Sequence, residues 1–103
     1  MDDIQEHTFK AAIIEAIEKH IAAGGKITNR TFTSVDGQCP VTCLIDGEDI
    51  YDCSKGLTIK LGFPVSSKEA WSVIDGFDDI EGSIYRDLEL YGFGQELRKK
   101  YLP

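Results

Sequence analysis

The chain has 103 residues, of which 42% are apolar, and a formal net charge of −7 at pH 7. This length provides one hydrophobic core but no second one, so we expect a single domain over residues 1–103. The negative charge disfavours direct nucleic-acid binding and favours a basic protein partner, and no apolar run approaches the ~20 residues that cross a membrane.

The cysteine content indicates a reducing compartment. The chain has three cysteines, Cys39, Cys43 and Cys53. An odd number leaves one thiol unpaired in any disulfide scheme, and a domain with this apolar content needs no disulfide. The N-terminal stretch MDDIQE is acidic, whereas a secretory signal begins with a basic region. We therefore expect free thiols and a cytoplasmic location.

The first predicted element is an amphipathic helix over residues 4–23. Its apolar stripe recurs at helical spacing and consists of Phe9, Ile13, Ala16, Ile17, His20 and Ile21. Asp3 and Glu6 have the spacing of a capping box, and Gly24 follows the last turn. Because His20 lies on the stripe near the end of the helix, we interpret it as a packed or capping residue.

The segment around residues 28–45 favours a short irregular hairpin. Threonine, phenylalanine and valine favour an extended chain before Asp36-Gly37, a dipeptide typical of tight turns. Pro40 has no amide donor for a central strand, and it suits the first position of a helical turn equally well. Residues 39–45 are therefore either a strand or a helical turn.

Residues 54–61 can be read as a strand or as a helix. Leu57, Ile59 and Leu61 alternate as they would in a strand. The tripeptide that follows, Gly62-Phe63-Pro64, is a typical helix terminator, since glycine adopts the left-handed conformation and proline cannot continue a helix. This terminator favours the helix.

A third helix is predicted over residues 67–75. Ser66 supplies an N-cap oxygen, and Glu69 stands where its side chain reaches back to the free amide. Gly76 is the expected end of this helix.

The final helix is predicted over residues 86–101. Gly94 falls on its apolar stripe, where a glycine costs ~1 kcal/mol relative to alanine and indicates close approach of another helix. The expected fold class is α+β, mostly helical, with four helices and the short hairpin around a single core.

Two stretches resemble a pattern found in small uncharacterised proteins of bacteria and their phages. Ile74-Asp75-Gly76-Phe77-Asp78 is similar to the IDGFD-like helix end of that family, and the stretch from Phe93 to Tyr101 is similar to its closing LGRxLRxxY-like helix. The chain departs from the pattern at Phe93-Gly94-Gln95, where the family has Leu-Gly-Arg. The resemblance implies a phage or mobile-element origin but no reaction, ligand or cofactor.

The candidate metal ligands are Cys39, Cys43 and Cys53, to which His7 or His20 could add a nitrogen. Structural zinc sites typically use Cys-x2-Cys pairs, so this spacing matches poorly, and we expect buried thiols and no cofactor. The sequence has no Gly-x-Ser-x-Gly motif and no phosphate loop. We expect a protein that is not an enzyme, with a small metal-binding or thiol enzyme as an alternative.

The remaining candidate residues suggest an interaction surface. Trp71 and Tyr91 are aromatic residues of the kind that anchor interfaces. Between them in the sequence, Asp75 ends the predicted third helix, and Asp78 and Asp79 begin an acidic turn. The leading hypothesis is a small acidic module for protein interaction or regulation, with a basic partner.

Two alternatives involve nucleic acid. Residues 54–77 have a helix-turn-helix order, but Lys68 is the one basic residue near the start of the expected recognition helix. An acidic mimic that occupies the basic groove of another protein fits the charge better, because residues 36–96 hold 13 acidic and 4 basic residues.

Overall fold

A computed structural model describes residues 1–27, 37–38, 41 and 53–102. The described residues include the helices α1 (Asp3–Ala22), α3 (Cys53–Leu61), α4 (Ser67–Asp78) and α5 (Glu89–Tyr101) and the two-residue strands β1 (Lys26–Ile27) and β2 (Gly37–Gln38). The mostly helical fold predicted from the sequence is confirmed. Among the helices described, none is long and apolar enough to cross a membrane.

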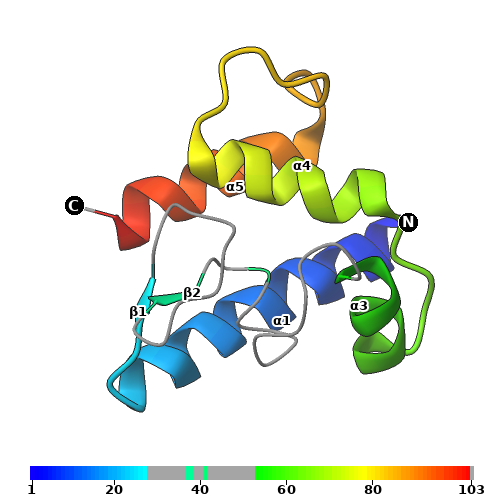
Figure 1. Cartoon of the computed structure of the whole chain (residues 1–103). Helices are drawn as coiled ribbons and strands as arrows, with labels where there is room; N and C mark the ends of the chain where they lie inside the picture. Colours follow the sequence, from blue (N-terminus) through cyan, green and yellow to red (C-terminus); the bar gives the residue numbers. More distant parts are fainter. Residues whose placement is uncertain (28–36, 39–40, 42–52, 103) are drawn as a thin grey trace.

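Helices α4 and α5 cross each other in close contact and run in the same general direction (Figure 1). Gly76 lies against the backbone of Tyr91 at the crossing. Beyond it, near the C-terminal ends of both helices, Phe77 accepts a hydrogen bond from Arg98, 2.8 Å away. The connection between the helices, residues 79–88, must therefore run back along the pair, and we call it the crossover segment. It projects on the side of the pair away from α1 (Figure 1).

Helix α1 contributes one apolar face to the core. Phe9, Ile13 and Ile17 on this face are completely buried, as the stripe predicted, whereas Ile21 at the end of the helix is exposed. The rest of the buried core comprises Val41, Leu57, Val65, Ala70, Val73, Ile74, Phe77, Leu90, Phe93 and Leu97. The four helices described here thus meet in one interior.

The N-cap of α1 is Asp2, one residue before the predicted cap. The Asp2 side chain accepts a hydrogen bond from the Gln5 amide at 2.8 Å, and the Gln5 side chain accepts one from the Asp2 amide at 3.3 Å. Asp2 is extended, with φ −76° and ψ 175°, whereas Asp3 is already helical. The predicted Asp3–Glu6 box is wrong for this reason, because an N-cap residue must lie outside the helical conformation.

Two glycines allow the backbones of α4 and α5 to touch. A Cβ atom on Gly76 would collide with the carbonyl oxygen of Tyr91, and one on Gly94 would collide with the carbonyl oxygen of Val73. The close approach predicted from Gly94 is confirmed. Backbone atoms cannot move aside as a flexible side chain can, so both positions require glycine.

The predicted end of α4 at Gly76 is wrong, because the helix continues for two residues beyond it. Asp79 then takes the left-handed conformation, with φ 57° and ψ 48°. Two side chains from α5 bind the carbonyls of the last turn. Gln95 donates to the Gly76 carbonyl at 2.6 Å, and Arg98 donates to the Phe77 carbonyl. The Gly76 carbonyl also accepts from the Asp79 amide at 3.2 Å, and the side chains of α5 add partners for carbonyls at this helix end.

Helix α5 begins three residues later than predicted. Residues 83–88 form tight turns instead, in which the Arg86 amide donates to the Ser83 carbonyl at 3.4 Å and the Leu88 amide to the Tyr85 carbonyl at 2.9 Å. Bonds between residues three apart are typical of turns and not of an α-helix.

The helix favoured for residues 54–61 is confirmed as α3. Gly62 follows it with φ 80°, the left-handed conformation that the terminator predicted. The Thr58 hydroxyl accepts a hydrogen bond from the Val65 amide at 2.9 Å, which fixes the turn into α4. The predicted capping box of Ser66 and Glu69 is also present.

The strand pair differs from the predicted hairpin. β1 and β2 are parallel, with Lys26 opposite Gly37 and Ile27 opposite Gln38, whereas the strands of a hairpin are antiparallel. Gly37 therefore lies in a strand and not in a tight turn. Most of the predicted hairpin, residues 28–36 and 42–45 together with Cys39 and Pro40, lies outside the described residues.

Candidate functional site

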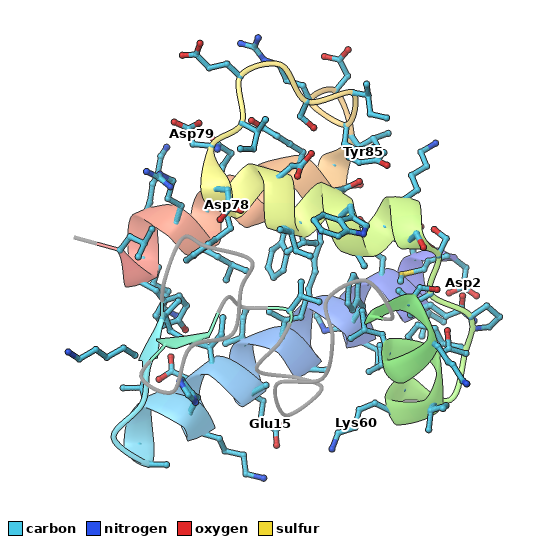
Figure 2. All side chains as sticks on the ribbon, viewed as in Figure 1. Asp2, Glu15, Lys60, Asp78, Asp79 and Tyr85 are labelled. Carbon is cyan, nitrogen blue, oxygen red and sulfur yellow. The ribbon has the colours of Figure 1, made fainter. Side chains whose placement is uncertain are left out.

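Two of the three candidate acids stabilise the end of α4. The Asp75 carboxylate accepts a hydrogen bond from the Ser83 hydroxyl at 2.8 Å, which ties α4 to the crossover segment. The Asp79 carboxylate accepts one from the Gln95 side chain at 3.0 Å. Figure 2 shows Asp79 at the end of α4, where the crossover segment begins. Both acids have structural partners, and Asp79 also remains exposed.

Asp78 is in a different environment. Its Oδ1 atom is buried and has no hydrogen-bond partner among the described residues. Burial, together with the neighbouring negative charge of Asp75, raises the pKa of Asp78 to about 7, although the positive charge of Arg98 acts in the opposite direction. Asp78 therefore changes charge near neutral pH.

The two candidate aromatic anchors differ in exposure. Trp71 is half-buried and packs against the core. Tyr91 is only 7% exposed, and its hydroxyl donates to the Ile80 carbonyl at 3.0 Å. The ring of Tyr91 therefore supports the crossover segment from inside and offers little area to a partner.

The crossover segment exposes two isoleucines that sequence analysis did not identify as candidates. Ile84 is 86% exposed and Ile80 is 44% exposed. The signal was present, because Ile84 stands in a run of polar and turn-forming residues with no helical or strand partner for its side chain. The exposure of Ile84 could only be established once the path of the crossover segment along α4 and α5 was known.

Hydrogen bonds hold the crossover segment in a defined conformation. The Ser83 amide donates to the Ile80 carbonyl at 3.2 Å, and the Tyr85 amide donates to the Ser83 hydroxyl at 3.0 Å. With the bonds from Ser83 to Asp75 and from Tyr91 to Ile80, the segment is fastened to both helices. Figure 2 shows Tyr85 near the helices while the outer part of the segment projects away from them.

Carboxylates surround these isoleucines along the chain. Residues 79–89 contain Asp79, Glu81, Asp87 and Glu89 and a single base, Arg86. All five are exposed. This stretch, which we call the acidic crossover surface, combines exposed aliphatic side chains with a negative charge.

A depression of about 340 Å³ lies beside this surface. It is lined by Met1, Glu6, Ser66, Lys68, Glu69, Ser72, Leu88, Glu89 and Leu90. Its carboxylates already have partners, since Glu69 accepts hydrogen bonds from Ser66 and Glu6 pairs with Lys10 at 3.5 Å. Burial acts to raise the pKa of Glu69, but the bonds from Ser66 and the nearby N-terminal amine together lower it below its usual value. The lining therefore stabilises the start of α4.

The two histidines do not meet at one site. His7 is exposed on α1, and the His20 Nε2 atom lies 3.0 Å from the Lys26 carbonyl oxygen. The His20 ring also covers Gly25, which agrees with the packed role, one of the two predicted; its hydrogen bond goes to β1 and not to the last turn of α1. Within the described part of the chain, no three His, Cys, Asp or Glu residues gather as metal ligands. Cys39 and Cys43 lie outside that part, as does the side chain of Cys53.

The predicted recognition helix presents few polar groups. This helix is α4, and the polar residues at its start are Ser67, Lys68, Glu69 and Ser72. Ser72 is completely buried, and Glu69 belongs to the capping box. Ser67 and Lys68 remain exposed. One lysine provides little of the phosphate contact on which DNA binding depends.

Comparisons with known proteins return no match. No family model, no curated protein and no solved structure matches the chain.

Proposed function

We propose that the chain is a non-enzymatic module that binds a partner protein through the acidic crossover surface. The observation that carries this proposal is the exposure of Ile84 and Ile80 on a segment that hydrogen bonds hold in place. Burial of aliphatic surface away from water favours association. An ordered segment also loses little conformational entropy when it binds, which favours affinity.

A regulatory role, a phage or mobile-element origin and a cytoplasmic location belong to the same proposal. The origin is supported by the resemblance of the α4 and α5 sequences, and the location by the odd number of cysteines. The acidic composition supports a partner that is not a nucleic acid.

The test is comparative capture of partners from the organism that encodes the chain. Immobilised wild-type protein and two variants, Ile84→Ser and Ile59→Ser, would be cross-linked to bound proteins and analysed by mass spectrometry. Ile59 is the matched control, because it is an isoleucine 74% exposed on α3 and distant in sequence from the crossover segment.

We expect a partner that the wild type and Ile59→Ser retain in stoichiometric amounts and that Ile84→Ser loses. Equal retention by both variants would contradict binding through the crossover segment. The absence of any stoichiometric partner for the wild type would contradict the proposal that the chain is a protein-binding module.

A further inference from the structure

We infer that a lysine- or arginine-rich segment of the partner docks on the acidic crossover surface and covers Ile84 with aliphatic side chains; this inference rests on the proposed function. The surface has both parts of a typical interface. Exposed aliphatic side chains supply the apolar centre, and charged groups supply the rim.

The negative charge of the surface specifies a partner segment of positive charge. Residues 79–89 contain four carboxylates and one guanidinium, so their formal charge is −3. All five charged side chains are exposed. Charges in the rim of an interface steer encounter and suppress partners of the same sign. A cationic partner segment is therefore attracted, and an acidic one is repelled.

The individual carboxylates are accessible to such a partner. Glu81 and Asp87 are exposed on either side of Ile84 in the sequence. Glu89 is exposed as well, and its side chain pairs with Lys10 at 3.5 Å. A lysine or arginine of the partner can approach these groups without breaking the hydrogen bonds that hold the segment.

The same charges disfavour other occupants. A second copy of the chain also carries a net charge of −7, so two copies repel each other. Nucleic acids and anionic lipid surfaces are negative too. A lysine or arginine side chain combines an aliphatic stem with a cationic head, and it can cover Ile84 while it pairs with a carboxylate.

The ordered conformation of the segment holds its aliphatic anchor ready for a partner. Tyr91 supports Ile80 from inside, and Ser83 links the segment to α4, so Ile84 is presented at a fixed position. A partner that covers Ile84 would exclude water from it, which is the condition under which one interface residue contributes much of the affinity.

The experiment uses the full chain and a synthetic probe. The probe is an amphipathic peptide of about 14 residues with leucine at helical spacing and lysine elsewhere. The matched probe has glutamate in place of every lysine. Binding is followed by NMR chemical shifts of the backbone amides for the wild type, Ile84→Ser, Glu81→Gln and Glu15→Gln. Glu15 is exposed on α1, and Figure 2 shows it on the opposite side of the molecule from the crossover segment.

We expect the lysine peptide to shift residues 79–89 and the glutamate peptide to shift none. Ile84→Ser should weaken binding about tenfold, and Glu81→Gln about two- to fivefold, while Glu15→Gln leaves it unchanged. Shifts spread over α1 and α3, equal effects of Glu81→Gln and Glu15→Gln, or self-association through residues 79–89 would overturn the inference. If a partner captured from the organism is lost on Ile84→Ser while the lysine peptide does not bind, the proposed function stands and the cationic partner is wrong.

Discussion

Two neighbouring regions of the chain differ in their surroundings. The crossing of α4 with α5 is packed against backbone atoms, whereas the crossover segment that joins these helices exposes side chains to water. At Gly76 and Gly94 an added methyl group would meet backbone atoms of the opposite helix. At Ile84 a smaller side chain would change the contact with water and little else, because the residue is almost fully exposed. The difference separates residues that maintain the fold from residues that are available for binding.

The crossing also explains how the crossover segment is held. Side chains of α5 bind the end of α4, and Asp75 and Tyr91 reach from the two helices to Ser83 and Ile80 in the segment. A change at the crossing is therefore expected to disturb the segment, whereas a change at the tip of the segment leaves the crossing intact.

The largest effect is expected for Gly94→Ala. The added Cβ collides with the Val73 carbonyl, so the helices must separate, and overpacking of this kind costs about 3 kcal/mol of unfolding free energy. Urea denaturation followed by circular dichroism measures the loss. Gly92→Ala is the control, since a Cβ at that exposed position of the same helix meets nothing within 4 Å. It should leave stability unchanged or raise it by up to about 1 kcal/mol. Similar losses for both variants would contradict the close approach at Gly94.

A smaller loss is expected for Arg98→Met. The variant keeps much of the aliphatic stem but removes the hydrogen bond to the Phe77 carbonyl, which leaves the end of α4 without that partner. Loss of a hydrogen bond from a charged donor costs about 1.5 kcal/mol. Lys99→Met, at the neighbouring exposed position, should lie within about 0.5 kcal/mol of the wild type. Equal unfolding midpoints for the two variants would show that Arg98 does not cap α4.

Asp78→Asn is expected to change how stability depends on pH. The pKa of Asp78 is raised from 3.8 to about 7 in the folded protein, so the folded state binds a proton that the unfolded state has lost. Stability should therefore fall as pH rises from about 4 to about 7 and then level off. An asparagine side chain cannot ionise, so the fall should be smaller in the variant, which should be the more stable protein at about pH 8. Because Asp78 is only half-buried, solvent screening limits the increase in unfolding free energy of the variant to about 1 kcal/mol.

Thermal unfolding of wild type and Asp78→Asn across this pH range measures the effect. Parallel curves for the two proteins would contradict a raised pKa at this residue. Arg98 acts to lower the pKa of Asp78, so in Arg98→Met the fall should be larger and extend to higher pH.

Local signals in the sequence predicted most of the helical framework. The Ser66–Glu69 capping box, the terminator at Gly62 and the close approach at Gly94 each depend on residues near one another or on the stripe of a single helix, and the structure contains all three. The cap of α1 was misplaced by one residue because aspartate occurs at both positions 2 and 3.

The errors at the candidate site have a common cause. α4 passes Gly76 because Gln95 caps it from 19 residues away, and Tyr91 is buried because its hydroxyl binds Ile80, 11 residues earlier. Both contacts depend on how α4 and α5 cross and on the direction in which each runs, and no local pattern indicates that arrangement. The polar and turn-forming residues around Ile84 were a local signal, but its exposure depends on the same arrangement, which the sequence alone does not establish.

Ile84→Ser is expected to have the smallest effect on stability and a large effect on binding. The residue is 86% exposed, so the free energy of unfolding should change by no more than about 0.5 kcal/mol. The most direct test measures urea unfolding and partner capture on the same preparations of wild type and Ile84→Ser. We predict coincident unfolding curves together with loss of the partner from the variant. Coincident curves with the partner fully retained would contradict a binding role for the crossover segment.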